Sequence, residues 1–401
     1  MKVLKEQAIS GARAKLLATR SLPAPANDYR PKLKALESLR GLLALWVVAA
    51  HVAGRSLLDA DIKEAHLVAL TEPLLPVYVF MMLSGFVIFL MLDHEREEYV
   101  PYLIRRFFRL APLYYVVLGV SALLVGTQLH ALESLPWVNR SVSDSITVHR
   151  ETLASFWSNL SAHLLLLQGV IPEALLRDVN FTFLSHGWSV SLEWQFYLVA
   201  PVFFYLAIQR EYLLLISTAI VLGALQALSL FGVGFFPNQF HYFVIGIASY
   251  YLYAMTRQKP KLAGWARDVV LAAILAAVAF ILPEPWPVII WLLVLDTLLM
   301  QKVGASSTIS KVIGRILKCP PFLYLGRVSY SIYLVHIPIL YVVFHGLTHY
   351  APGLTGWTFL GVALPLVLMT SIGVASLTYR LIELPGIRLG AYFAMKRGAY
   401  A

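Results

Sequence analysis

The sequence predicts an all-α integral membrane protein with about ten transmembrane helices and both chain termini in the cytoplasm. Of its 401 residues, 59% are hydrophobic and 13% are charged, whereas soluble domains contain about a quarter charged residues. The apolar residues also occur in runs of about 20, the length of helix that crosses roughly 30 Å of hydrocarbon. Lipid is therefore the expected solvent for most of the chain.

Ten apolar runs with polar flanks are candidate membrane spans. They cover residues 37–57, 73–92, 110–127, 187–208, 212–231, 239–256, 266–282, 286–301, 322–345 and 357–379.

The positions of the basic residues test this count, because cytoplasmic loops of membrane proteins carry an excess of Lys and Arg. With the N-terminus inside, 27 of the 32 Lys and Arg residues fall in cytoplasmic stretches. The five exceptions are Arg55, Lys63, Arg140, Arg150 and Arg177. The net charge of +10 is thus explained by the basic cytoplasmic stretches of a membrane protein. No nucleic-acid partner is expected.

The chain is expected to have three parts. Residues 1–33 form a basic, partly disordered cytoplasmic arm, either a solvated tail or a helix lying on anionic lipid. Residues 34–390 form the membrane domain, and 391–401 form a cytoplasmic tail. An outer segment, 128–186, contains an apolar piece at 160–170 that is too short to span and suggests a re-entrant or interfacial helix. No soluble domain is expected.

Arg40 and His51 are the first candidate functional residues, since ionisable groups inside lipid are costly. They are eleven positions apart, so both project from one helix face, roughly 16 Å apart. The arginine then lies at the cytoplasmic mouth and the histidine deep in the membrane. This placement suits an anchor for an anionic donor below a proton acceptor, although a single histidine can also be a hydrogen-bonded core residue.

Arg105, Arg106 and Arg109 form a basic cluster at the cytoplasmic start of a predicted span. Arg105 and Arg109 share a helix face at i and i+4. The cluster can bind phosphates through guanidinium contacts at a helix N-terminus. It can equally anchor the helix to lipid headgroups.

Ser189, Glu193 and Tyr197 form a polar stripe that begins at the outer face. A carboxylate at Glu193 can orient a histidine or receive the proton of a hydroxyl. Trp188, Trp194 and Tyr197 also fit an aromatic belt at the membrane interface.

Ser329, Tyr333 and His336 form a second polar stripe at i, i+4 and i+7. It fits a cavity wall or interhelical hydrogen bonds equally well. Asp296 and Glu383 stay unassigned, with a structural role favoured.

Several of these motifs, in their order and spacing, together resemble the membrane acyltransferase family 3, which includes bacterial O-acetyltransferases of lipopolysaccharide, other glycans and macrolides. The resemblance covers residues 34–390. It is carried by Leu36-Glu37-Ser38-Leu39-Arg40-Gly41 with His51, Leu83 to Ile88, Arg105 to Pro112, Trp188 to Tyr197, Tyr330 to His336, and Glu383-Leu384-Pro385. The family's first motif often reads Leu-Asp-Gly-Leu-Arg-Gly, so this chain lacks its aspartate and first glycine.

The resemblance implies an O-acyltransferase of the inner membrane that takes an acyl group, commonly acetyl, from cytoplasmic acyl-coenzyme A. The acceptor is expected to be a hydroxyl of a glycan or similar molecule at or across the membrane. No metal and no fused outer hydrolase-like domain are expected. The implied roles are catalysis by His51, Arg40 and Glu193, donor binding by Arg105, Arg106 and Arg109, and substrate binding by Trp188, Ser189, Tyr197, Tyr333 and His336.

Two mechanisms and one rival function stay open. His51 can act as general base on the acceptor hydroxyl, or it can carry the acyl group covalently. The rival is a transporter or flippase of glycans or lipids, since ten helices with few buried charges describe many carriers. The sequence leaves the acyl chain length, the acceptor and the oligomeric state undetermined.

Overall fold

The computed structural model describes residues 30–257 and 264–398. Within these ranges the chain is helical and forms no β-strand, apart from one isolated bridge between Pro172 and Phe231. The predicted all-α class is therefore confirmed. Most of the predicted N-terminal arm lies outside the described residues, and its last four residues belong to the first helix.

Six helical segments of the described chain are long and apolar enough to cross a membrane. They are α2 (Arg30–Ser56), α5 (Leu74–Glu95), α6 (Tyr99–Glu133), α9 (Trp188–Ile208), α16 (Ser329–Tyr350), and α17 (Gly356–Thr378) with its continuation through a π-helical turn (Tyr379–Glu383) into α18 (Leu384–Gly398). A multi-pass membrane protein follows from these helices.

The four other predicted spans also fall on helices. These are α10 (Tyr212–Ala227), α11 (Phe236–Met255), α12 (Gly264–Ile281) and α13 (Trp286–Lys302). Their lengths are 16, 20, 18 and 17 residues, so α10 and α13 are short for a membrane of about 30 Å. The count of ten spans stays a prediction.

Two helix boundaries differ from those predicted. Helix α6 begins at Tyr99 rather than near residue 110, because the arginines in its first turns have protein partners and do not end the helix. The predicted span 322–345 is divided at Val328 into α15 (Pro320–Arg327) and α16. The first eight residues of the predicted C-terminal tail, 391–398, continue α18.

The predicted outer segment contains two helices followed by turns. They are α7 (Arg140–Ala154) and α8 (Phe156–Leu164). Helix α8 ends at Leu164, so the apolar piece 160–170 is only half helical, and residues 165–187 form turns and bends. The short helices α3 (Asp59–Glu64), α4 (Val68–Thr71) and α14 (Thr308–Ile316) complete the described elements.

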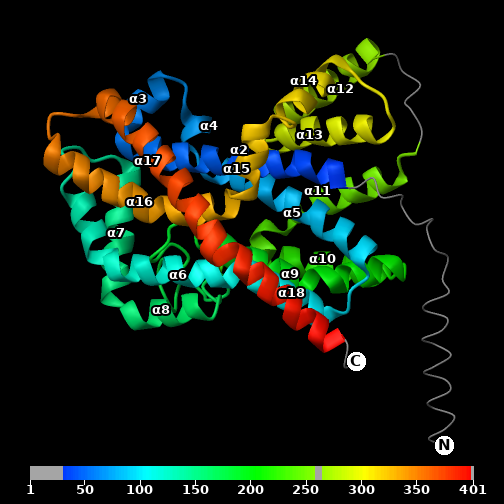
Figure 1. Ribbon diagram of the computed structural model, residues 1–401, viewed down its shortest axis with the longest axis horizontal. Helices are drawn as coiled ribbons and strands as arrows, with labels where there is room; N and C mark the ends of the chain where they lie inside the picture. The colour runs from blue at the N-terminus through cyan, green and yellow to red at the C-terminus, as the bar shows by residue number, and fades with distance from the viewer. Residues whose placement is uncertain (1–29, 258–263, 399–401) are drawn as a thin grey trace, which may run out of the picture.

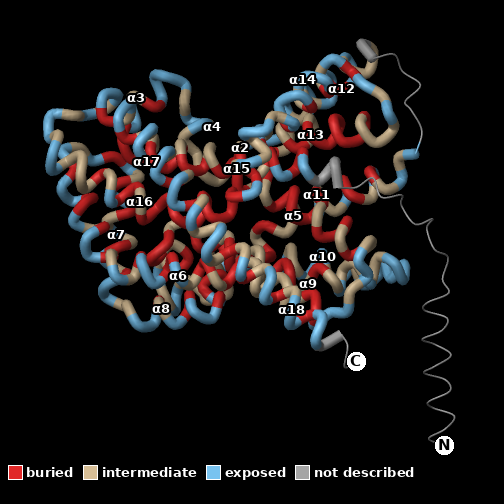
Figure 2. Tube along the Cα trace, in the orientation of Figure 1, coloured by how far each residue is buried: buried red, intermediate tan, exposed pale blue. Residues whose placement is uncertain are grey.

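The central helices pack closely because glycines lie at their crossings. In Figure 1, α2 and α5 run through the middle of the molecule, and α16 lies on the left of the view next to α6 and α17. Figure 2 shows the buried residues along these helices. A Cβ atom on Gly41 of α2 would lie 2.6 Å from the main-chain nitrogen of Gly326, and one on Gly246 of α11 would collide with the carbonyl oxygen of Met82. Small residues at helix crossings are typical of packing in membranes.

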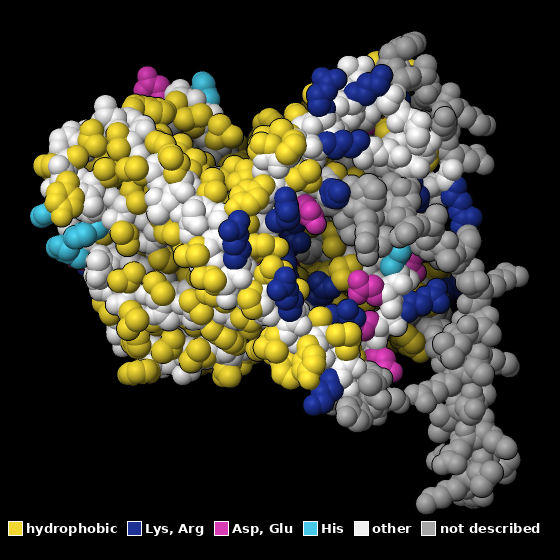
Figure 3. Space-filling model, viewed as in Figure 1, with side chains coloured by type: hydrophobic (Ala, Val, Ile, Leu, Met, Phe, Trp, Pro, Cys, Tyr) yellow, Lys and Arg dark blue, Asp and Glu magenta, His cyan; other side chains and the backbone are white. Residues whose placement is uncertain are grey.

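Apolar side chains cover much of the outside of the bundle. Leu123, Leu213 and Phe280 are 87%, 81% and 92% exposed. In Figure 3, most of the dark blue Lys and Arg side chains lie on the half of this face that contains α12–α14 and the end of α18, whereas the other half is largely hydrophobic. This distribution fits a chain whose natural solvent is lipid.

Candidate active site

His51 lies deep in α2 and is held by an arginine one turn further along the helix. It is 9% exposed, and Arg55 is 5% exposed. Nη1 of Arg55 lies 2.9 Å from Nδ1 of His51, and Nη2 donates to the Ser145 hydroxyl of α7 at 3.1 Å. The guanidinium also lies 5.9 Å from the ring centre of Tyr341 on α16. Contacts to α7 and α16 therefore fix the arginine that positions the His51 ring.

Two further histidines extend from His51 inside the bundle, His336 against His51 and His186 against His336. The His336 ring of α16 is 5.3 Å from the His51 ring, and the His186 ring is 4.8 Å from His336, centre to centre. His336 is fully buried and His186 is 2% exposed. Burial lowers the pKa of His186, which lies two residues before α9, well below its ordinary value. These three residues form a buried histidine cluster.

Several nitrogens around the histidine cluster have no hydrogen-bond partner. These buried atoms are Nε2 of His336, both ring nitrogens of His186 and Nε of Arg55. Buried polar atoms are paired in the great majority of cases, so each exception requires an explanation such as a catalytic role. The described residues contain no group of three or more His, Cys, Asp or Glu side chains placed to bind a metal ion.

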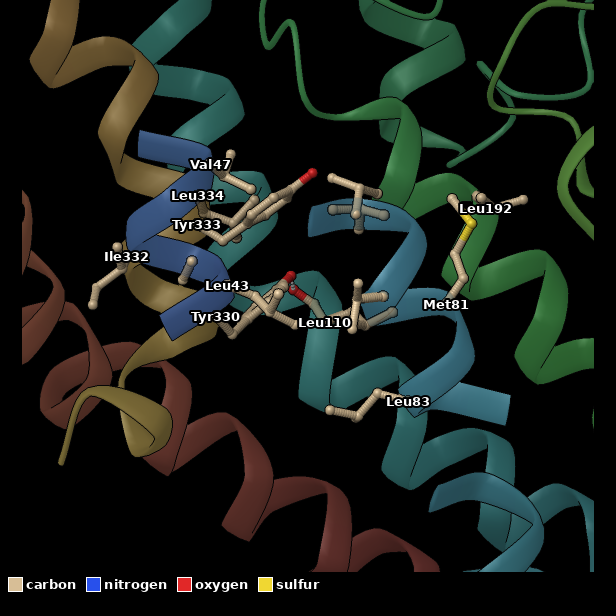
Figure 4. Close-up of a cluster of buried hydrophobic side chains, with 14 of the residues drawn as sticks. Leu43, Val47, Met81, Leu83, Leu110, Leu192, Tyr330, Ile332, Tyr333 and Leu334 are labelled. Atoms are coloured by element: carbon tan, nitrogen blue, oxygen red, sulfur yellow. Dashed lines mark hydrogen bonds between the residues drawn. The ribbon is translucent and has the colours of Figure 1, made fainter. Parts of the chain in front are cut away.

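A pocket lies between α2, α5, α9 and α16. It contains about 590 Å³ of space not filled by atoms, part of which is open to the outside. Its walls are mostly apolar. The polar side chains that line it are Arg40, Ser84, Ser189, Glu193, Ser329, Tyr330 and Tyr333. Figure 4 shows Tyr330 and Tyr333 projecting from α16 toward the side on which Met81 and Leu192 lie.

Tyr333 lies between the pocket and the histidine cluster and contacts both. Its hydroxyl lies 2.7 Å from the Ser189 hydroxyl, and its ring is 4.9 Å from the His186 ring. Its main-chain oxygen accepts a hydrogen bond from Nδ1 of His336 at 2.7 Å. The structure thus brings together the predicted residues Ser189, Tyr333 and His336, although the first two are 144 positions apart.

Glu193 and Tyr197 connect the pocket to the arginines of α6. Glu193 lines the pocket and accepts a short hydrogen bond from the Tyr197 hydroxyl. The Arg106 guanidinium lies 5.7 Å from the Tyr197 ring centre. The contact of Glu193 in the described chain is therefore with a tyrosine and not with a histidine. Trp188 is 3% exposed and packs in the hydrophobic core rather than at the surface.

The other two arginines of α6 have carboxylate partners. Arg105 pairs with Glu97 at 2.5 Å, and its side chain is 40% exposed. Arg109 pairs at 3.1 Å with Glu383, whose side chain is fully buried and also accepts a hydrogen bond from Ser331 at 2.7 Å. Since α6 begins at Tyr99, these arginines lie within the helix and not at its N-terminus. Glu383, which the sequence left unassigned, is the buried partner of Arg109.

Asp296, also unassigned from the sequence, pairs with Arg267. Its Oδ1 lies 2.5 Å from Nη2 of Arg267, and the carboxylate is 6% exposed. This pair joins α12 to α13, and neither residue lines the pocket. The structure thus favours the structural role expected for Asp296.

Two more buried histidines hold α7 and α8 against the bundle. His163 of α8 lies 2.8 Å from the Tyr114 hydroxyl through Nδ1 and 2.9 Å from the Thr182 hydroxyl through Nε2. His149 of α7 lies 3.1 Å from the Gln128 side-chain oxygen. Burial lowers the pKa of each of these histidines to about 4. Neutral histidines therefore fasten α7 and α8 to α6.

The structure adds two residues that the sequence interpretation did not assign to the site. Arg55 was only an exception to the positive-inside pattern, and His186 was only part of the motif before α9. A signal for Arg55 was present, because it follows His51 by four positions and so shares its helix face. No periodicity indicates His186, because it lies in a loop that only the tertiary fold brings beside His336.

Comparisons with known proteins agree with these features. A family model described as "Acyltransferase domain" matches residues 33–378. The protein named Acyltransferase MdmB, from Streptomyces mycarofaciens, is 28% identical over 175 residues, which are 43% of this chain and 39% of that protein. The chain thus matches about two fifths of the length of this relative. No solved structure matches the chain. Because the family model covers most of the sequence, the chain belongs to the membrane acyltransferase family 3.

Proposed function

We propose that this acyltransferase moves an acyl group, in the first instance acetyl, from cytoplasmic acyl-coenzyme A to a hydroxyl of a glycan or similar acceptor at or across the inner membrane. The observation that carries the proposal is the disposition of α2. Arg40 of this helix lines the pocket, and His51 lies in the buried histidine cluster about 16 Å further along.

The pocket suits the thioester arm of an acyl donor better than its phosphates. Its walls are mostly apolar, with Arg40 and Glu193 as their charged side chains. A narrow apolar passage can hold an uncharged chain, while phosphates need several positive groups. We place the phosphates toward Arg106, which lies over Tyr102 and Tyr197 at 5.5 and 5.7 Å. Arg105 and Arg109 are also assigned to donor binding. This assignment requires each guanidinium to contact the donor while it stays paired with its carboxylate, Glu97 or Glu383.

The two routes proposed for the transfer both require His51. In the first, His51 acts as the general base that removes the proton of the acceptor hydroxyl, which attacks the thioester directly. In the second, His51 receives the acyl group and passes it to the acceptor. Substrate contacts are assigned to Ser189, Tyr333 and His336, which lie between the pocket and the histidine cluster, and to Trp188 and Tyr197 nearby on α9.

The test is transfer of radiolabel from acetyl-coenzyme A in inside-out vesicles that contain the wild type or His51→Ala. Label is followed into protein, glycan and lipid fractions. We expect label in one acceptor fraction only when His51 is present, with equal amounts of both proteins in the membrane. Normal labelling by His51→Ala would refute the assignment. Movement of glycan or lipid without consumption of acyl-coenzyme A would favour a transporter.

A further inference from the structure

Hydrogen bonds determine which nitrogen of His51 carries the proton. A guanidinium group only donates hydrogen bonds, so Arg55 donates and Nδ1 of His51 accepts at 2.9 Å. A neutral imidazole with an accepting Nδ1 carries its proton on Nε2. In this arrangement neither nitrogen of His51 presents an open lone pair.

Hydrogen bonds give His336 the opposite arrangement. A carbonyl oxygen only accepts, so Nδ1 of His336 donates to the main-chain oxygen of Tyr333 at 2.7 Å. The proton of neutral His336 is thus on Nδ1, and Nε2 keeps a free lone pair. This atom is buried and has no hydrogen-bond partner.

We propose that His336 is a second catalytic residue, which takes the proton of the acceptor hydroxyl on Nε2. The proposal rests on the proposed function, follows its direct-attack route without an acyl group on His51, and moves the base from His51 to His336. His51, with its proton on Nε2, is a hydrogen-bond donor, and His336 is the base. Their ring centres lie 5.3 Å apart, so both can contact one reacting group.

The surroundings of His336 fit an acceptor hydroxyl. His186 places two unpaired ring nitrogens against it, with the ring centres 4.8 Å apart. Tyr333 separates the cluster from the pocket, and its hydroxyl bonds to Ser189. A polar acceptor group at this point would satisfy nitrogens that the protein alone leaves unpaired.

The step balances as follows. The O–H bond of the acceptor breaks, its proton moves to Nε2 of His336, and the oxygen forms a bond to the acyl carbon. The carbon–sulfur bond then breaks, and coenzyme A leaves as a thiolate. The thiolate takes the proton from His336, which returns to its neutral form.

The experiment compares two acceptors in vesicles that contain His336→Asn. The asparagine amide can replace Nδ1 as donor to the Tyr333 carbonyl, while Nε2 is lost. One acceptor is the glycan or lipid fraction that the wild type labels from acetyl-coenzyme A. The other is hydroxylamine, which attacks a thioester without first losing a proton and forms a measurable hydroxamate. His349→Ala, an exposed histidine on the same helix, is the control.

We expect His336→Asn to lower hydroxyl acylation at least about 100-fold, in the range of general-base effects. Hydroxamate formation should stay within about ten-fold of the wild type, and His349→Ala should resemble the wild type with both acceptors. Unchanged hydroxyl acylation would overturn the proposal. Equal loss with both acceptors in correctly inserted protein would also overturn it and make His336 structural.

A second variant tests the same proposal in the event that His336→Asn inserts poorly into the membrane. His336→Gln places a non-basic amide near the position of Nε2, and the same difference between acceptors is expected. If the wild type forms neither ester nor hydroxamate, the proposed function itself fails. That outcome is distinct from selective loss of hydroxyl acylation in the variants.

Discussion

Nη1 of Arg55 lies 2.9 Å from Nδ1 of His51. Arg55 follows His51 by one turn on the same face of α2. The same guanidinium reaches Ser145 of α7 at 3.1 Å. Its position thus couples the histidine to α7. A change in how α7 packs would move the guanidinium and, with it, the His51 ring.

Replacing Arg55 by lysine is expected to lower transfer by at least about ten-fold. Lysine keeps the charge, but one ammonium group cannot bridge His51 and Ser145 with the geometry of two guanidinium nitrogens. The measurement is kcat and KM for labelled acetyl-coenzyme A in vesicles. Arg150→Lys is the matched control, because Arg150 is 66% exposed and pairs with Glu133. Wild-type rates in Arg55→Lys would show that this contact does not matter.

Arg109→Ala is expected to lower the free energy of unfolding by about 3–5 kcal/mol, because it leaves Glu383 buried without its partner. Arg105→Ala should cost about 0–1 kcal/mol, since that side chain is 40% exposed. Thermal unfolding in detergent measures both. Similar losses for the two variants would contradict a structural role specific to Arg109.

The donor-binding role of Arg109 is tested separately. Adding Glu383→Gln to Arg109→Ala removes the unpaired charge and should recover part of the lost stability. The double variant then allows KM for the acyl donor to be compared in folded protein. We expect a raised KM. A donor KM equal to that of the wild type would leave Arg109 with only its structural role.

The sequence predicts the helical class and the main spans because the cost of placing polar groups in lipid is visible in the residue order. The ten predicted spans all fall on helices. The start of α6 was misplaced by about ten residues, because three arginines look like a boundary. The partner of Arg109 is Glu383, which lies far away in the chain and cannot be identified from local pattern.

The candidate site was predictable only in part, for the same reason. His51, Ser189, Tyr333 and His336 were found as polar residues on apolar helices, and the fold brings them together. The position of His186 depends on how residues 165–187 fold over the bundle, for which the sequence has no periodic signal. Glu193 was predicted from its place on the polar stripe of α9, as a carboxylate that can orient a histidine. In the structure it accepts a hydrogen bond from Tyr197 of the same stripe.

The stability of the protein is expected to fall as the pH decreases from about 6.5 to 4. Burial lowers the pKa of His163 from 6.5 to about 4, so the unfolded chain binds a proton that the folded chain does not bind in this range. The full stability is therefore present above pH 6.5 and is lost on acidification, by about 3 kcal/mol for a shift of this size. His149 acts in the same direction.

The measurement is the thermal unfolding midpoint at pH 7.5, 6, 5 and 4.5 in one detergent. His163→Gln should have a lower midpoint at pH 7.5 but a weaker dependence on pH, since one titrating group is removed. His349→Gln changes an exposed histidine and should keep the wild-type dependence. An identical pH slope in His163→Gln and the wild type would contradict the role of His163.

Gly246→Ala tests the close packing of α5 and α11. A Cβ at this position collides with the main-chain oxygen of Met82, and a backbone atom cannot move aside as a flexible side chain can. We expect a loss of at least about 1–3 kcal/mol, as for an overpacked core. The control is Gly119→Ala on α6, where nothing lies within 4 Å of an added Cβ, and where alanine should stabilise the helix by about 0.8–1 kcal/mol.

Because the pocket lies between α2, α5, α9 and α16, a displaced α5 would also change the shape of the pocket. Gly246→Ala should therefore lose acyl transfer together with stability, whereas retention of both would show that the two helices can separate without cost.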